Sequence, residues 1–126
     1  MNSDTTEIRP SAAMTNIEIA DSYLEAIRRK DPSKAMFAPE VTLQFPLSPR
    51  KVMGREQVIE YILSLLPGID DVTLERHMTG GDYVATLWQA HTVWGELPIC
   101  SVFHISDGLI REVRSFWDPR PVLPKA

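Results

Sequence analysis

Residues 82–119 decide the fold predicted for this chain, and they read DYVATLWQAHTVWGELPICSVFHISDGLIREVRSFWDP. Three runs rich in valine, isoleucine, threonine and aromatic residues are separated by two turn signals, Gly95-Glu96 and Ser106-Asp107-Gly108. Such runs, bounded by glycine and aspartate, are typical of antiparallel strands joined by hairpins. Each run has about ten residues, which is longer than the usual strand. Strands of this length can curl around a helix and leave a hollow that the rest of the chain would close.

The composition indicates one globular domain. The chain has 126 residues, of which 44% are hydrophobic and 24% charged, enough to form a hydrophobic core. A net charge of −4 argues against a surface that follows the phosphates of a nucleic acid. Cys100 is the single cysteine, which excludes an internal disulfide and a thiolate metal cluster within one chain.

The same sequence contains no targeting signal that we can identify. The first 14 residues lack the apolar core of a secretory signal. No apolar run approaches the ~20 residues of a membrane-spanning helix. We therefore expect a cytoplasmic protein with no membrane partner.

The N-terminal half is predicted to be mainly helical. Residues 1–14 are polar and aperiodic and are expected to form a flexible tail. A first helix begins near Asn16, because Thr15 and Glu18 have the spacing of a capping box and apolar residues follow at helical intervals. Asp31-Pro32 predicts a short second helix over residues 33–38, since proline suits the first turn of a helix.

The remaining segments complete an α+β layout. We expect a short strand over residues 41–45, a third helix from Gly54 to Pro67-Gly68, and one antiparallel sheet over residues 72–118. The prolines that follow end regular structure, which leaves residues 121–126 as a C-terminal tail. Helices followed by an antiparallel sheet are typical of an α+β domain, here spanning residues 15–120.

Several short segments, taken in order, resemble the nuclear transport factor 2-like (NTF2-like) superfamily and, within it, the SnoaL-like and ketosteroid isomerase branches. These segments are YLEA at 23–26, APEVTLQFP at 38–46, GREQ at 54–57, SDGLI at 106–110 and FWDP at 116–119. The resemblance implies a cone in which three N-terminal helices pack in a strongly bent, mainly antiparallel sheet. It also implies an internal pocket and, often, a dimer across the outer face of the sheet.

The resemblance also suggests roles for individual residues. Ketosteroid isomerases use a tyrosine and a protonated carboxylic acid as oxyanion donors and an aspartate as base. Tyr23 corresponds to that tyrosine, whereas Phe45 stands at the position of the base and Ser101 at that of the second acid. A related group, the limonene epoxide hydrolases, would need an aspartate near Ser115. Trp117 corresponds to a tryptophan at the pocket wall of some isomerases.

Alternation along the strands predicts which side chains face the pocket. The residues expected to bind a substrate, beside a catalytic Tyr23, are Phe45, Thr86, Trp88, Ser101, Phe103, Ser115 and Trp117. The outer face of the sheet is then expected to carry Gln89, His91, His104 and Arg114. A single β-bulge would exchange the faces beyond it.

Structural explanations compete with these roles. A tyrosine on an apolar helix face is often a core residue with a paired hydroxyl, and Trp88 and Trp117 suit a core as well as a pocket wall. His77, His91 and His104 lie on three separate predicted strands without a tight pair, so we expect no metal site. His91 and His104 are interpreted as interface residues, with an acid–base role as the alternative.

Three functions remain open from the sequence. The favoured one is a metal-free and cofactor-free isomerase, cyclase or dehydratase that acts on an apolar carbonyl compound such as a polyketide or terpenoid. In that reading Tyr23 donates a hydrogen bond and the aromatic walls shape the substrate. The second is a pocket that binds a small apolar molecule without catalysis. The third is a dimeric adaptor of the NTF2 type that uses the outer face of the sheet.

Overall fold

A computed structural model describes residues 14–46 and 50–123 of the chain. Two α-helices and six strands occur in these residues, in the order α1 (Asn16–Arg28), β2 (Phe37–Gln44), β3 (Val52–Met53), α2 (Arg55–Leu65), β4 (Ile69–Gly80), β5 (Tyr83–Thr92), β6 (Gly95–Ser106) and β7 (Leu109–Phe116). Short 3-10 turns lie at η1 (Pro32–Lys34), η2 (Leu66–Gly68) and η3 (Arg120–Val122). The α+β class is thus as predicted.

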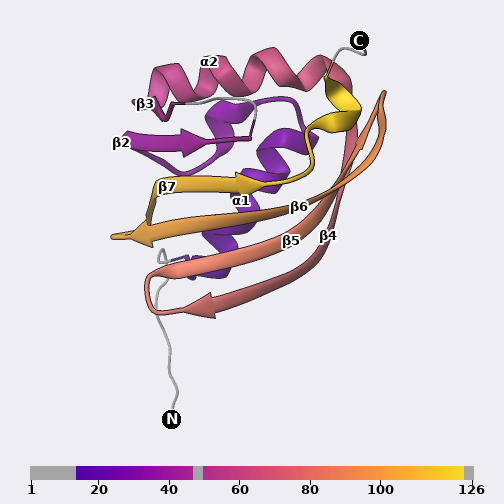
Figure 1. Ribbon diagram of the computed structural model, residues 1–126. Coiled ribbons are helices and arrows are strands. Elements are labelled where there is room, and N and C mark those ends of the chain that lie inside the picture. Colours follow the sequence, from indigo (N-terminus) through magenta and orange to yellow (C-terminus); the bar gives the residue numbers. More distant parts are fainter. Residues whose placement is uncertain (1–13, 47–49, 124–126) are drawn as a thin grey trace.

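The six strands form one mixed sheet in the order β3-β2-β7-β6-β5-β4. All neighbouring strands are antiparallel except β2 and β7, which run parallel. The sheet is strongly bent, and α1 packs against its inner side while α2 runs beside β2 and β3 (Figure 1). This curvature leaves room between the helices and the strands.

Helix α1 begins where its capping residues predict. Thr15 Oγ1 accepts a hydrogen bond from the Glu18 amide at 3.1 Å, and Glu18 Oε1 accepts one from the Thr15 amide at 2.8 Å. This reciprocal pair satisfies two of the amides that a helix N-terminus leaves free. The apolar face of the helix buries Ile19, Leu24 and, between them, Tyr23.

The predicted second helix over residues 33–38 is wrong. The chain makes only the 3-10 turn η1 after Asp31 and enters β2 at Phe37. Met36 O accepts a hydrogen bond from the Ile110 amide at 2.7 Å, so pairing with β7 begins here. Pro39 also disfavours helical backbone at the residue before it. Long-range pairing therefore prevails over a local helix signal, and the described chain has two α-helices where three were predicted.

One of the two predicted hairpin turns is displaced. The β6–β7 turn lies at Asp107 and Gly108, both with positive φ, as the sequence indicates. The β5–β6 turn is made by Val93 and Trp94, because Thr92 pairs with Gly95. Gly95 begins β6 with a φ of 108°, a conformation that favours glycine. The glycine therefore marks the residue after the turn.

Burial follows the predicted alternation on β5, β6 and β7. Register shifts interrupt the pairing at four places, on β2, twice on β4 and once on β7, and two of them bear on the inward-facing residues. On β7 the shift lies at Arg111, so Ile110 and Val113 both face inward. On β4 one shift lies at Glu75, which has no register partner on β5, although its carboxylate accepts a hydrogen bond from Gln89 Nε2 at 3.1 Å. Beyond that bulge the faces of β4 exchange, and His77 points inward.

The predicted tails fall largely outside the described structure, since residues 1–13 and 124–126 are not part of it. The loop residues 47–49 are likewise outside it. Val122, which the sequence places in the C-terminal tail, packs against the hydrophobic core. None of the helices over residues 14–46 and 50–123 combines the length and apolarity that crossing a bilayer requires.

Candidate functional site

A cavity of about 390 Å³ lies between the helices and the inner face of the sheet. This volume is within the roughly 300–1,000 Å³ of known small-molecule pockets. Its wall includes Tyr23 from α1, Phe45 after β2, Trp88 from β5, Ser115 from β7 and Trp117 after β7. No aspartate, glutamate, histidine, lysine or arginine is among the described residues that line it. The cavity is therefore apolar with a few hydroxyl groups.

Tyr23 holds the most buried of these hydroxyl groups. The residue is 1% exposed, and its ring contacts Phe37 and Phe103 edge to face at centroid distances of 6.2 Å and 5.1 Å. Its Oη is the one buried side-chain nitrogen or oxygen without a hydrogen-bond partner among the described residues. Burial raises the pKa of Tyr23 well above its ordinary value, and the nearby Ser115 hydroxyl opposes this only in part. Tyr23 is thus a neutral donor.

A pair of buried serines lies behind the cavity wall. Ser101 Oγ and Ser115 Oγ are 2.7 Å apart, and Trp88 Nε1 donates to Ser101 Oγ at 3.0 Å. Because an indole nitrogen can only donate, Ser101 accepts from Trp88 and keeps its own proton for another acceptor. The pair fixes the Trp88 ring at the wall and presents Ser115 to the cavity.

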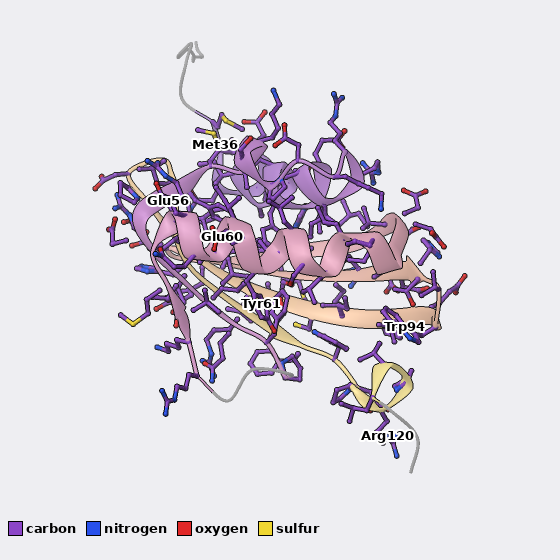
Figure 2. All side chains as sticks on the ribbon, turned by 90° about the horizontal axis from the view of Figure 1, so that it is seen from above. Met36, Glu56, Glu60, Tyr61, Trp94 and Arg120 are labelled. Atoms are coloured by element: carbon purple, nitrogen blue, oxygen red, sulfur yellow. The ribbon has the colours of Figure 1, made fainter. Side chains whose placement is uncertain are left out.

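Aromatic side chains form a second part of the wall. The Phe45 ring contacts Tyr61 at 5.7 Å and Trp117 at 6.5 Å, in both cases edge to face. Tyr61 comes from α2 and points toward the sheet (Figure 2). Phe45 and Trp117 line the cavity, and Tyr61 supports Phe45 from α2 without lining it, so the three rings join the end of β2, helix α2 and the end of β7. This region suits a flat apolar ligand.

The predicted substrate-binding residues divide into two groups. Five predicted site residues lie at the cavity, as given above, whereas Thr86, Ser101 and Phe103 face inward but are not part of its lining. Ser101 acts on the wall through Trp88 and Ser115. Phe103 packs on the Tyr23 ring. Thr86 instead contacts His77 on β4.

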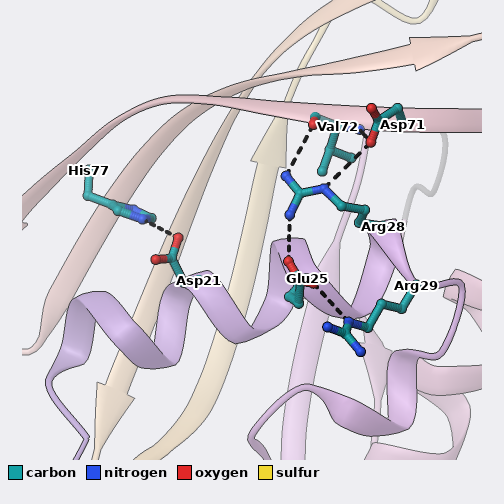
Figure 3. Close-up of polar contacts among 7 residues, drawn as sticks. All are labelled: Asp21, Glu25, Arg28, Arg29, Asp71, Val72 and His77. Carbon is teal, nitrogen blue, oxygen red and sulfur yellow. Dashed lines mark hydrogen bonds and ion pairs between the residues drawn. The ribbon is translucent and has the colours of Figure 1, made fainter.

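His77 belongs to a histidine–aspartate pair between β4 and α1, which the sequence analysis missed. His77 Nδ1 lies 2.8 Å from Thr86 Oγ1, and His77 Nε2 lies 2.7 Å from Asp21 Oδ1 (Figure 3). The His77 side chain is 7% exposed, whereas that of Asp21 is 51% exposed. Uninterrupted alternation from Val72 would turn His77 outward, so only the bulge at Glu75 brings it inside.

A cationic contact joins the last turn of α1 to the same strand. Arg28 Nη2 donates to Val72 O at 3.2 Å, and Arg28 Nε lies 3.5 Å from Asp71 Oδ1 (Figure 3). Glu25 pairs with both Arg28 and Arg29, which lowers the pKa of its carboxyl. The Arg28 contacts join the end of α1 to β4, whereas the Glu25 pairs lie within the helix.

The two histidines proposed as alternative acid–base residues lie on the outer face. His91 contacts Thr73 at 2.7 Å and Glu96 at 3.2 Å, and His104 stacks on Tyr83 with 4.9 Å between ring centroids. Neither lines the cavity. Over the described residues no three histidine, cysteine, aspartate or glutamate side chains converge as metal ligands.

The mouth of the cavity was also missed by sequence reasoning. Among the lining residues, the partly or fully exposed ones include members of the turn η2, Val93 and Trp94 of the β5–β6 turn, and Val122, which places the mouth at this end. A valine and a tryptophan at the tip of a hairpin are unusual, because turns favour glycine, proline, asparagine, aspartate and serine. This unusual turn composition was the sequence signal that could have predicted the mouth of the cavity.

Comparison with known proteins agrees with this architecture. The SnoaL-like domain family matches residues 20–113, most of the chain. The chain belongs to the SnoaL-like domain family. The resemblance to this branch of the NTF2-like superfamily is therefore confirmed. No curated protein sequence matches this SnoaL-like domain.

Solved structures share the fold of this SnoaL-like domain at low sequence identity. A candidate SnoaL-like polyketide cyclase from Jannaschia sp. CCS1 has a TM-score of 0.76 at 20% identity, covering 93% of this chain and 94% of its own. A steroid delta-isomerase from Pseudomonas aeruginosa has a TM-score of 0.70 at 18% identity, with coverages of 86% and 83%. The epoxide hydrolase/cyclase-like SalBIII, from pyran ring formation in salinomycin, has a TM-score of 0.73 at 21% identity, with coverages of 84% and 92%.

Proposed function

We propose that this SnoaL-like domain binds a small, mainly apolar molecule with a carbonyl oxygen and converts it by isomerase, cyclase or dehydratase chemistry. The unpartnered Tyr23 hydroxyl carries the proposal. Buried polar groups in folded proteins almost always have partners, and an exception calls for an explanation. A ligand oxygen that accepts from Tyr23 Oη, beside the buried Ser115, would supply the missing hydrogen-bond partner.

The proposed chemistry follows from what the wall offers. Tyr23 stays protonated because burial raises its pKa, so it can donate to an oxygen on which negative charge develops. No carboxylate or imidazole is among the described lining residues, so proton abstraction by a side-chain base of the wall is not part of the proposal. Folding a reactive chain against aromatic walls and polarising its carbonyl suits these groups better. Similar folds in a candidate polyketide cyclase and in SalBIII support this direction.

A second candidate is binding without turnover. The observation that favours it is the same lack of an acid–base pair in the described lining. In that case Tyr23 and Ser115 would orient a ligand and the aromatic rings would supply most of the affinity. The protein would then act as a carrier or sensor of an apolar compound.

A single substitution separates the two candidates. Tyr23→Phe keeps the ring contacts with Phe37 and Phe103 and removes the hydroxyl. Binding is measured with prodan, an environment-sensitive naphthyl ketone, and with the same dimethylaminonaphthalene lacking the acyl group. We expect the variant to lose about 1 kcal/mol of affinity for prodan and nothing for the carbonyl-free compound.

Turnover is tested with a panel of ketones and polyketone chains, followed by mass spectrometry for isomers, ring closure and loss of water. On a converted substrate, Tyr23→Phe should lose on the order of 2.7–4 kcal/mol of transition-state stabilisation. Binding that responds to Tyr23 without any turnover across the panel would favour the carrier. Equal affinity of wild type and variant for prodan would refute the role of Tyr23 in both.

A further inference from the structure

Two turns close together form the mouth of the cavity. One is η2 at the end of α2, and the other is the β5–β6 turn that carries Trp94 beyond the C-terminal end of α2 (Figure 2). The Val93 amide donates to Gly68 O at 3.0 Å, which joins the two turns directly. Gly68, Val93 and Trp94 all line the cavity.

The indole of Trp94 lies directly on the backbone of Gly68. A methyl group added at Gly68 would meet Trp94 Cζ3 at 2.5 Å and Cη2 at 2.7 Å, well inside van der Waals contact. Gly68 does not have the positive φ that distinguishes Gly54, Gly81, Gly95 and Gly108. A side chain at Gly68 would therefore displace the Trp94 ring, while the backbone conformation itself would accept any residue.

The backbone of the turn is held, whereas the ring is not. The Trp94 amide donates to Thr92 Oγ1 at 3.0 Å, and the same hydroxyl donates to Gly95 O at 2.6 Å. Together with the bond to Gly68, these contacts fix the turn at both ends. The Trp94 side chain, however, is 51% exposed. Half-exposed side chains change rotamer far faster than loops or domains move.

We infer that the Trp94 indole, seated on Gly68, is the gate of the cavity and sets the size of the ligands that enter. This inference rests on the proposed binding of a small apolar molecule. Rotation of one ring away from Gly68 opens the mouth without any change in the sheet or in α2. The deep wall with Tyr23 and Ser115 recognises the ligand oxygen, and Trp94 limits the length of its apolar part.

The gate is tested first with two ketones that share one fluorophore, prodan and the longer-chained laurdan. Trp94→Ala should raise the association and dissociation rate constants of prodan, in stopped flow, by on the order of tenfold each. It should also raise the affinity for laurdan relative to prodan. Trp94→Phe should restore most of the wild-type selectivity. Unchanged rates and unchanged selectivity in Trp94→Ala would overturn the inference.

Gly68→Ala provides an independent route to the same displacement. The added methyl group pushes the ring aside, so this variant should behave like Trp94→Ala, and the double variant should show no further change. Gly80→Ala is the matched control, because an added methyl at Gly80 meets nothing within 4 Å. Additive effects of the two substitutions would contradict a shared gate.

A measurement without ligand tests the gate independently of the proposed function. Trp94→Ala and Trp94→Phe both lack the Trp94 emission, so their fluorescence comes from Trp88 and Trp117 at the cavity wall. Acrylamide should quench this emission at least about twofold more strongly in Trp94→Ala than in Trp94→Phe, since an open mouth admits a small quencher. Equal quenching in the two variants refutes the gate, even if prodan binds. Unequal quenching supports it, even if prodan does not bind and the proposed function fails.

Discussion

Tyr23 places a polar atom deep in the interior, near the Ser115 hydroxyl. Its ring is held between Phe37 and Phe103, and its hydroxyl has no partner among the described residues. Burying an unpaired hydroxyl costs about 1–3 kcal/mol, because the water it loses is not replaced. A functional group retained at such a cost is typical of binding and catalytic sites, where stability and activity oppose each other.

We therefore expect Tyr23→Phe to raise the free energy of unfolding by about 1 kcal/mol. This free energy is measured by urea denaturation, with circular dichroism as the signal. Tyr61→Phe is the control: Tyr61 is only partly buried, and its change should stay within about 0.5 kcal/mol. A less stable Tyr23→Phe would mean that the hydroxyl is well paired in the folded protein, which would remove the main support for a ligand oxygen at this site.

The buried Tyr23 hydroxyl also predicts how the free energy of unfolding depends on pH. Because the pKa of Tyr23 is raised in the folded protein, folding favours the protonated phenol. Its contribution to stability is fully present below the unfolded pKa of about 10 and is lost as the pH rises above that value. The stability advantage of Tyr23→Phe over wild type should thus grow above pH ~10 and stay constant below it. An advantage that is flat across this range would contradict the buried position of the hydroxyl.

Strand β4 shows how one extra residue redirects an element. Glu75 is skipped in the strand register, and beyond it His77 turns inward, where it reaches Thr86 on β5 and Asp21 on α1. A carboxylate can only accept, so Nε2 of a neutral His77 carries the proton toward Asp21 and Nδ1 accepts from the Thr86 hydroxyl. The bulge thereby joins a helix to two strands of the sheet.

Asp21→Ala should lower the free energy of unfolding by about 1 kcal/mol, because it leaves the buried imidazole without its acceptor on α1. The control is Glu60→Ala, which removes an exposed carboxylate from α2 (Figure 2). Thermal denaturation of the two variants gives the comparison. Equal effects would show that the pair contributes no more than an ordinary surface carboxylate. In the wild type, nitrogen NMR of His77 should find the proton on Nε2.

At the scale of the whole molecule, the outer face of the sheet is rich in aromatic groups. Tyr83 and Phe116 are each 50% exposed, the first stacked on His104 and the second beneath the Arg114 guanidinium at 5.3 Å. Gln89 and His91 continue this face on β5. Symmetric dimers are the commonest oligomers, and a two-fold axis would bury the same residues on both chains.

We expect the protein to be a dimer through this face, with Phe116→Glu shifting it to the mass of one chain in light scattering. A charge buried in an apolar contact between two chains is costly, whereas a charge on a surface that stays in water is not. Leu63→Glu, at an exposed apolar residue of α2, should leave the dimer intact. A wild-type protein that scatters as one chain at micromolar concentration would rule the dimer out.

The sequence by itself determined those features that depend on neighbours along the chain. The capping box at Thr15, the long strands, the alternation that turns Trp88 and Ser115 inward, and the family were all predicted from local patterns. Five of the eight residues predicted for the pocket also line the cavity, whereas the alternative acid–base residues His91 and His104 do not. Strand periodicity carries this information because adjacent side chains must point to opposite faces.

Only the tertiary structure decided the rest, because those features depend on contacts between distant segments. Residues 37 and 38 joined β2 through pairing with β7, where the local signal predicted a helix. The bulge at Glu75 turned His77 inward, since register is set by the partner strand and by burial. Trp94 rests on Gly68 because two turns, separated along the chain, meet at one mouth. No local pattern records such a meeting, since it arises only when the sheet bends around α1.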